Sequence, residues 1–274
     1  MSEEFISSNE VLIAFALTLF AGLSTGIGSA IAFFAKRTNT KFLSIALGFS
    51  AGVMIYLSFV EIFPKAKEIL SQEMGVQAAY LMTVTAFFAG IILIAVIDRL
   101  VPEFENPHEL KRVELIHDHE ADKSRKLYRM GMMSALAIAI HNFPEGLATF
   151  LAALHDIRLG LPIAIAIAIH NIPEGIAISV PIYHATGSRR KAFMYSFLSG
   201  LAEPVGALVG FFLLMPFMSE IVFGFLFASV AGIMVFISID NLLPAAREYG
   251  EPHLSLYGLT GGMALMAVSL VFFM

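Results

Sequence analysis

Histidine, asparagine and glutamate recur together in two hexapeptides, HNFPEG at 141–146 and HNIPEG at 170–175, each inside an apolar run. At about 100° per residue, the three polar side chains of each hexapeptide lie within one arc of about 100° on a helix. Imidazole, carboxylate and amide groups are ligands that suit Zn²⁺, Fe²⁺, Mn²⁺ or Co²⁺. A third glutamate follows in a later apolar run, directly before a proline. The candidate metal ligands are His141, Asn142, Glu145, His170, Asn171, Glu174 and Glu203.

Each hexapeptide also holds a proline, which has no N–H to donate to the carbonyl four residues back. Pro144 therefore leaves the carbonyl of Ile140 without its helical partner, and Pro173 does the same for Ile169. We expect each helix to kink at its proline and to leave an oxygen atom free to bind a ligand.

The composition predicts that membrane helices carry these residues. Of the 274 residues, 58% are hydrophobic and 14% are charged, whereas soluble domains are usually about a quarter charged. The apolar residues come in blocks of about 20, the length that crosses roughly 30 Å of hydrocarbon as a helix. The lack of cysteine excludes disulfides and thiolate metal sites, and the net charge of −5 argues against a nucleic-acid partner.

Eight such blocks predict an all-α polytopic membrane protein with eight transmembrane helices, a single transporter-sized domain over 1–274. An even number of spans places both termini on one side of the bilayer. The acidic first residues lack the basic region of a signal peptide, so the first block should stay in the mature protein. The predicted spans are 11–34, 42–63, 77–98, 130–154, 159–183, 192–216, 219–243 and 256–274.

The basic residues predict the orientation of the bundle. The loops after spans 1, 3, 5 and 7 carry 14 of the 17 lysines and arginines, and such loops usually face the cytoplasm. Both termini should therefore lie outside, and the long loop 99–129 should be cytoplasmic. That loop contains His108, His117 and His119, which could hold a metal ion loosely. Its density of mixed charge favours the alternative, a solvated linker.

The sequence also contains an internal repeat. A shift of 180 positions aligns AGVMIYLSFVEIFPKAKE at 51–68 with AGIMVFISIDNLLPAARE at 231–248, and a shift of 178 aligns Gly28 with Gly206. Five spans separate the members of each pair, so the copies cross the membrane in opposite directions. We expect an inverted 3+2+3 repeat, with spans 1–3 and 6–8 around spans 4–5, an arrangement that suits alternating access around a mid-membrane site. Chance similarity among apolar helices is the alternative.

Three carboxylates at mid-membrane need a counter-charge, since each ionised side chain there costs about 2.5–3.5 kcal/mol on insertion scales. No lysine or arginine lies deep in any span, and a divalent cation would supply the charge. The alternative is a helix–helix contact in which Asn and His hydrogen-bond and the glutamates are protonated. Seven polar residues in repeated registers favour the cation.

Two acids lie closer to the membrane surfaces. Glu61 is near the outer end of span 2 and Asp240 near the inner end of span 7, so they could guide a cation toward the site and away from it. His184, at the inner end of span 5, could receive ions that leave. For both acids, an ordinary carboxylate that reaches the interface from a helix end is an equally good interpretation.

The two hexapeptides on consecutive helices, followed by GLAEPVGA at 200–207 and with ATGSRRKAF at 185–193 between, resemble the ZIP (Zrt-, Irt-like) family of metal transporters. The resemblance covers essentially the whole chain and is closest to a bacterial branch of the family. It implies uptake into the cytoplasm across the plasma (bacterial inner) membrane. It also implies an elevator-like movement of spans 1, 4, 5 and 6 against spans 2, 3, 7 and 8, and homodimers are common in the family.

The resemblance further implies two metal positions in the transport path. The first would use His141, Glu145, His170 and Glu174. The second would use Asn142, Asn171 and Glu203, with Glu145 and Glu174 able to bridge. Some members have Gln and Asp where this chain has His170 and Asn171, which lowers the negative charge at the second position here.

Two other classes of function remain open on the residues alone. A membrane-embedded metal-dependent hydrolase or oxidase also needs buried His and Glu, but intramembrane metalloproteases use HExxH, and here glutamate takes the i+4 position instead. A metal-selective channel is the other alternative. The expected function is uptake of a divalent cation, zinc or else iron, manganese, cobalt or cadmium, by a protein that is not an enzyme and needs no other cofactor.

Overall fold

A computed structural model describes residues 8–34, 40–100, 120–249 and 252–273, and every regular element in these ranges is helical. Eight of its stretches are long and apolar enough to cross a membrane, which confirms the predicted number of spans. They are Ser8–Ile31, Lys41–Met74, Val76–Arg99, Ala135–His155, Ile157–Thr186, Arg189–Phe217, Glu220–Arg247 and His253–Phe272.

The second and seventh spans each contain a short π-helix at matching places in the sequence alignment. The two π-helices begin at Ser58 and Ser238, which are 180 positions apart. Both serine hydroxyls donate to the carbonyl four residues back, over 2.7 Å in each case. The elements are α2 (Thr40–Leu57), η1 (Ser58–Ile62) and α3 (Phe63–Met74), then α9 (Glu220–Ile237), η5 (Ser238–Leu242) and α10 (Leu243–Tyr249).

One predicted boundary is wrong. The second span is predicted to end at 63, whereas its helix continues to Met74. Pro64 does not stop it because this proline lies in the first turn of α3, directly after a π-helix, where the usual i−4 bonding is already altered. The fourth span is predicted to start at 130, and the stretch apolar enough to cross the membrane begins at Ala135. Its helix, α5 (Glu120–His155), begins earlier, in a charged stretch that hydropathy excludes from the membrane.

The sixth span is broken rather than continuous. Helix α7 (Arg189–Gly200) and helix α8 (Ala202–Val209) are separated by a turn at Leu201. Pro204 has no N–H to donate to the carbonyl of Gly200. The turn at Leu201 therefore costs the helix no hydrogen bond at this position. The span then ends in η3 (Gly210–Leu214) and η4 (Met215–Phe217).

The remaining spans are single helices, and α5 and α6 are joined by one residue. Asp156 caps α6, its side chain accepting a hydrogen bond from the Arg158 backbone N–H over 2.8 Å. Gly187, at φ 63°, ends α6 in the left-handed conformation that glycine adopts without strain. The bounds are α1 (Ser8–Phe34), α4 (Val76–Leu100), α6 (Ile157–Thr186) and α11 (Pro252–Phe273).

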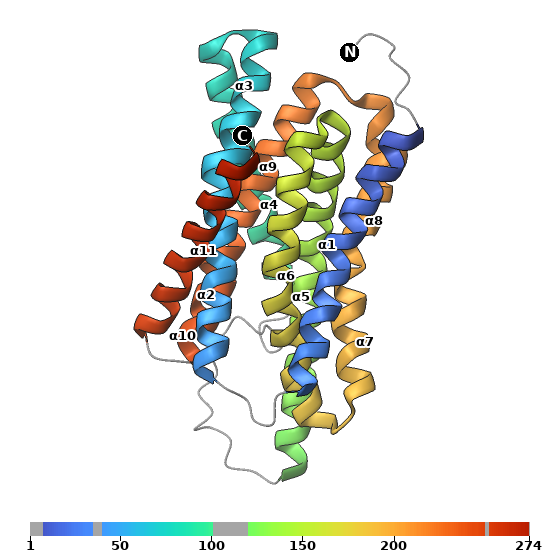
Figure 1. Ribbon diagram of the computed structural model, residues 1–274, viewed down its shortest axis with the longest axis vertical. Helices are drawn as coiled ribbons and strands as arrows, with labels where there is room; N and C mark the ends of the chain where they lie inside the picture. Colours follow the sequence, from blue (N-terminus) through green and yellow to red (C-terminus); the bar gives the residue numbers. More distant parts are fainter. Residues whose placement is uncertain (1–7, 35–39, 101–119, 250–251, 274) are drawn as a thin grey trace.

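The helices pack as two groups that lie side by side (Figure 1). One group, here the inner-site bundle, contains α1, α5, α6, α7 and α8, whose main neighbours are one another. The other, here the flanking bundle, contains α2, α3, α4, α9, α10 and α11. The bundles meet chiefly where α6 contacts α2 and where α5 contacts α9.

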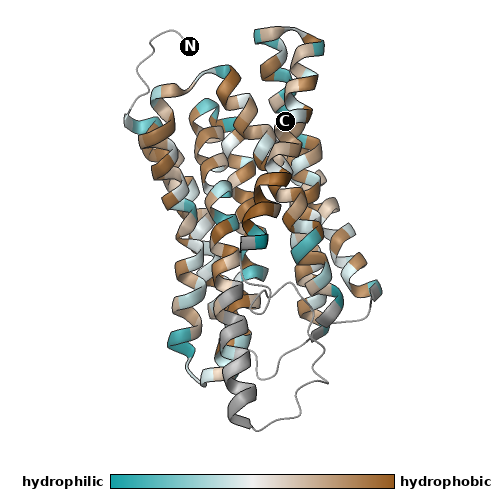
Figure 2. Ribbon diagram, turned by 180° about the vertical axis from the view of Figure 1, so that it is seen from behind, coloured by the Kyte–Doolittle hydropathy of each residue, from teal (hydrophilic) through white to brown (hydrophobic). Residues whose placement is uncertain are grey.

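The outside of the molecule is apolar along the spans, as Figure 2 shows by its brown helices. Large side chains such as Phe212 and Phe272 are 68% and 82% exposed. Such exposure is costly in water but suits contact with lipid. Helix α6 is the most buried of the eight spans, so its hexapeptide lies at the centre of the molecule.

Candidate metal site

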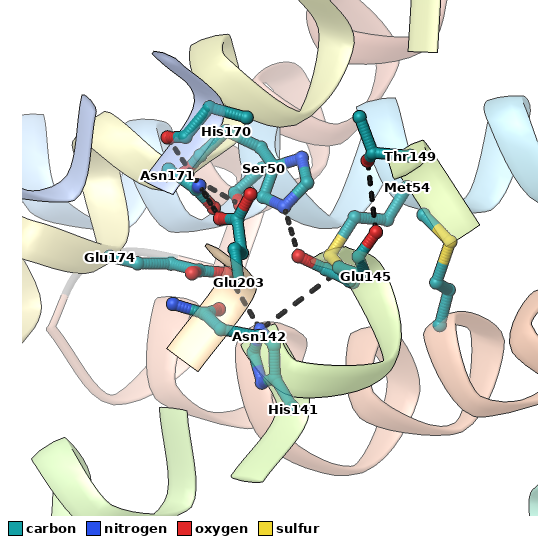
Figure 3. Close-up of polar contacts among 12 residues, drawn as sticks. Ser50, Met54, His141, Asn142, Glu145, Thr149, His170, Asn171, Glu174 and Glu203 are labelled. Carbon is teal, nitrogen blue, oxygen red and sulfur yellow. Dashed lines mark hydrogen bonds and ion pairs between the residues drawn. The ribbon is translucent and has the colours of Figure 1, made fainter. Parts of the chain in front are cut away.

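The structure brings the seven predicted side chains together at the centre of the inner-site bundle (Figure 3). Three come from α5, three from α6 and one from the second residue of α8. His141 is 4% exposed and the other six are fully buried. The one-residue connection between α5 and α6 makes the helices antiparallel neighbours, which sets the two hexapeptides face to face.

Each histidine pairs with the glutamate of the opposite hexapeptide. His141 Nε2 lies 3.2 Å from Glu174 Oε1, and His170 Nε2 lies 3.2 Å from Glu145 Oε2. His141 Nε2 is also 4.0 Å from Glu145 Oε1 on its own helix. The four side chains therefore form a closed set in which two carboxylates face two imidazoles across the α5–α6 contact.

The asparagines reach away from these pairs to the neighbouring helices. Asn142 donates to the carbonyl of Ser199 over 3.2 Å, and Asn171 donates to the carbonyl of Ala21 over 2.9 Å. Asn171 also donates to Glu203 Oε1, which connects α6 to α8. The asparagine N–H groups are thus used for packing, while the amide oxygens face the cluster.

Many acceptor atoms in the cluster have no hydrogen-bond partner. Leaving a buried polar atom unsatisfied costs about 1–3 kcal/mol, so such a concentration is unusual. A cation would satisfy the oxygen atoms, which cannot be satisfied by one another. The unpartnered buried atoms of the cluster are Asn142 Oδ1, Glu145 Oε1, Asn171 Oδ1, Glu174 Oε2, Glu203 Oε2 and His170 Nδ1.

The side chains lie close together, but they are not arranged as the ligands of a bound metal ion. Within the four described ranges, no three His, Asp or Glu side chains converge in a geometry that would hold a metal ion. In this conformation one nitrogen of each histidine is paired with one oxygen of Glu174 or Glu145. A cation would bind by replacing the His–Glu hydrogen bonds with coordination bonds.

Glycines allow the helices around the cluster to approach closely. A Cβ atom on Gly28 of α1 would lie 1.9 Å from the carbonyl oxygen of Ile172, and one on Gly206 of α8 would lie 2.2 Å from that of Phe143. Ile172 and Phe143 are the third residues of the two hexapeptides. The glycines are the pair that the 178-residue shift aligns, so the sequence contained the signal, although their role in positioning the ligands was not predicted.

The prolines do not end their helices, since both α5 and α6 continue past them. The carbonyl of His170, one residue after the predicted Ile169, accepts a hydrogen bond from another helix. Its donor is the hydroxyl of Ser50 on α2, 3.3 Å away and fully buried. Ser50 belongs to the flanking bundle, so this bond joins the two bundles at the depth of the site, and sequence reasoning missed it.

A small cavity reaches His141 from one side. It lies between α5 of the inner-site bundle and helices α4, α9 and η5 of the flanking bundle. Asp98 and Asn241 line it together with His141, and neither of the first two was predicted. Asp240, which was predicted to have a role here, is exposed, while its neighbour Asn241 faces the cavity. Glu61 is half-buried in η1.

The remaining histidines lie apart from the cluster. His155, for which the sequence suggested no role, contacts Glu220 and Phe223 of α9. His184 lies near the end of α6, beside Tyr183, and His253 stacks on Tyr257. The loop histidines 108, 117 and 119 lie outside the described residues.

Comparison with known proteins gives one consistent family. The family model described as ZIP Zinc transporter matches residues 101–270. A protein named Zinc transporter ZupT from Lysinibacillus sphaericus is 65% identical over 262 residues, covering 95% of this chain and 97% of its own length. Proteins of the same name from Nitratidesulfovibrio vulgaris and Streptococcus mutans are 63% and 62% identical, covering 98% and 97% of this chain and 100% and 99% of their own. The chain therefore belongs to the ZIP family of zinc transporters.

Proposed function

We propose that this protein carries divalent metal cations, zinc foremost, across the plasma membrane into the cytoplasm through the buried His–Asn–Glu cluster. The observation that carries the proposal is the set of buried, unpartnered oxygen atoms around two His–Glu pairs. The relatives over nearly the full length are named zinc transporters, which supports zinc as the cargo. Iron, manganese, cobalt and cadmium suit the same imidazole and oxygen ligands.

The cluster divides into two metal positions. The first uses the four residues of the reciprocal pairs, His141, Glu145, His170 and Glu174. The second uses the amide oxygens of the asparagines with Glu203, the seventh member of the cluster. The contact between Asn171 and Glu203 supports this division, because it pairs Glu203 with an asparagine rather than with a histidine.

Transport proceeds by alternating access between the two bundles, built as an inverted 3+2+3 repeat. The paired π-helices at 58–62 and 238–242, and the paired glycine contacts to the two hexapeptides, support the repeat. The separation of α1, α5, α6, α7 and α8 from the flanking bundle supports a rigid-body movement of the first group, which corresponds to spans 1, 4, 5 and 6. A moving group that carries its ligands on its own helices can cross the membrane without losing the ion.

The termini face outside and the loop 99–129 faces the cytoplasm, by the distribution of basic residues. In this orientation the cavity at His141 lies in the cytoplasmic half of the bundle, because Asp98 in its lining is close to the end of α4 at Leu100. This position supports an inward-facing conformation. Asp98 and Asn241 provide oxygen atoms on the path of release, and Glu61 guides cations on the outer side. A homodimer is the assembly that we propose on the family resemblance.

The family and the relatives are transporters, which argues against the alternative of a membrane-embedded hydrolase or oxidase. A channel needs a continuous open path, whereas the cluster is buried on every side except the small cavity at His141. A carrier is therefore the better interpretation of this geometry.

Uptake by purified protein in proteoliposomes tests the proposal. Zn²⁺ or Cd²⁺ should enter, and Glu145→Ala or Glu174→Ala should abolish entry, because each removes a carboxylate and strands the imidazole that it faces. A thermal melt of each variant checks that the protein remains folded. Zn²⁺ flux at the wild-type rate with both glutamates removed would contradict the assignment, and competition between metals would rank the cargo.

A further inference from the structure

The contact between α5 and α9 is closed at one end by three side chains. His155, the last residue of α5, places its Nδ1 atom 3.7 Å from Oε2 of Glu220, the first residue of α9. The imidazole ring also stacks on Phe223, with the centroids 4.6 Å apart and the rings 13° from parallel. Phe223 is 4% exposed and stacks in turn on Phe227. One histidine is therefore held by a charge and by an aromatic face of the same neighbouring helix.

At their other end, α5 and α9 are separated by the cavity at His141. The cavity at His141 has α5 on one wall, at Ala137 and Ile140, and α9 on another, at Phe236 and Ile237. His141 precedes His155 by fourteen residues, which is about 21 Å along a helix. The helices thus touch at the end near the α5–α6 connection and leave a hollow at the end near loop 99–129.

The two helices belong to different bundles, so their contact must change if the bundles move against each other. Glu220 and Phe223 are in the flanking bundle, and His155 is in the bundle that carries the ligands. A movement that opens the outer end must pull the imidazole off Phe223 and away from Glu220. The stacked ring makes this a specific contact rather than general apolar packing.

We infer that His155, Glu220 and Phe223 form an outer clasp, which holds the outer end of the α5–α9 contact shut in the inward-facing state and must open before a cation can reach the cluster from outside. The inference rests on the alternating-access function proposed above. The side chains of His155 and Glu220 are 27% and 25% exposed, so water can reach the pair. A partly exposed pair is weak, which suits a contact that breaks in every transport cycle.

Asp156 does not compete with Glu220 for this role in the structure. Its side chain accepts the backbone N–H of Arg158 and caps α6. Glu220 is therefore the carboxylate that the imidazole faces, and it is the residue to change.

A cross-link across the clasp tests whether it must open. The chain has no cysteine, so His155→Cys with Glu220→Cys introduces the only pair. Oxidation to a disulfide, or a short bifunctional thiol reagent where the Cβ atoms are too far apart for one, should abolish Zn²⁺ uptake. Reduction of the disulfide should restore Zn²⁺ uptake. Uptake at an unchanged rate by the fully cross-linked protein would overturn the inference.

The control cross-link joins Lys65→Cys and Glu68→Cys. These residues form a 3.1 Å ion pair on the same side of the molecule but within one helix, α3. A cross-link there spans no boundary between bundles and should leave Zn²⁺ uptake unchanged.

A second measurement reports on the clasp without transport. Leu151 is 4% exposed and lies one turn before His155 on the same face of α5. In a Leu151→Cys background, Glu220→Gln should raise the rate of labelling by an impermeant thiol reagent added outside about 1.5- to fivefold, as expected for loss of an exposed ion pair. Phe223→Leu should add to the increase.

Glu68→Gln in the same Leu151→Cys background is the matched control, because it breaks an ion pair within α3 and should leave the labelling rate unchanged. Equal labelling rates with and without the Glu220→Gln substitution would overturn the clasp. If the wild-type protein carried no Zn²⁺, the proposed function would fail, while the labelling rates would still decide whether this contact opens.

Discussion

Asn171 belongs to the second proposed metal position and holds Glu203 there through its side chain. Its N–H groups donate to the Ala21 carbonyl and to Glu203, and its oxygen has no partner. Asn171→Asp replaces the donor with a carboxylate that faces Glu203, so the metal-free protein should lose about 1–3 kcal/mol of stability. Bound Zn²⁺ should relieve the repulsion between the introduced carboxylate and that of Glu203. We therefore expect a lower Tm in chelator and a larger rise of Tm with Zn²⁺ than in the wild type.

Asn171→Ala distinguishes the loss of hydrogen bonds from the added charge as the cause of a change in Tm. It also removes the donated hydrogen bonds, so its Tm in chelator should fall, but it adds no charge and should not enlarge the rise with Zn²⁺. A smaller Zn²⁺-dependent rise in the Asp variant than in the wild type would argue that Asn171 is not at a metal position.

The sequence predicts which seven side chains gather in the buried cluster, but not how they pair. Spacing places His141 and Glu145 on one face of a helix, and on that basis each could have acted with the other. The structure instead pairs His141 with Glu174 and His170 with Glu145, because the α5–α6 connection sets the two motifs in opposite directions at the same depth. Which oxygen atoms stay unpartnered depends on distances between helices, and no sequence pattern encodes these.

Helix packing around the hexapeptides depends on two glycines at the closest backbone contacts. Gly28→Ala would press a methyl group against the Ile172 carbonyl, and Gly206→Ala would press one against that of Phe143. A backbone oxygen cannot rotate away, so each helix must shift. We expect each variant to lose about 1–3 kcal/mol of stability, measured as a lower Tm in detergent, and to lose most Zn²⁺ uptake because the ligands move apart.

Gly261→Ala is the matched control for these variants. Gly261 lies in α11, and a Cβ atom there would meet nothing within 4 Å. Alanine is favoured over glycine inside a helix by about 1 kcal/mol, so this variant should melt at the wild-type temperature or slightly above. Wild-type melting of Gly28→Ala would contradict the close approach of α1 to α6.

At the level of elements, hydropathy predicts the number of spans but not their interruptions. The π-helices at Ser58 and Ser238 and the break at Leu201 lie inside continuous apolar runs, where a hydropathy pattern carries no information. Their local signals are prolines, Pro64 and Pro244 after the π-helices and Pro204 after the break. A proline indicates only that one backbone hydrogen bond of the helix is missing. Whether the helix bends, widens or breaks in response depends on the neighbours against which it packs.

Across the whole molecule, the two main contacts between the bundles are chemically different, although the proposed repeat would relate them. The α6–α2 contact includes the buried hydroxyl of Ser50, and the α5–α9 contact includes the exposed pair of His155 and Glu220. A carrier made of two equivalent halves would favour neither side of the membrane. Under the proposed mechanism, the unequal contacts would stabilise one conformation over the other, here the proposed one with the outer end closed and the cavity at His141 open.

The orientation of the molecule in the membrane gives a prediction that does not depend on transport. Val76, at the start of α4, is 70% exposed, and Arg189, at the start of α7, is exposed near the end of the bundle that carries loop 99–129. Since the chain has no cysteine, Val76→Cys and Arg189→Cys each provide one thiol. An impermeant thiol reagent added to whole cells should label the first variant. It should label the second only after the cells are permeabilised, and the wild type in neither case. The opposite pattern would overturn the proposed orientation, because the cavity at His141 would then face outside.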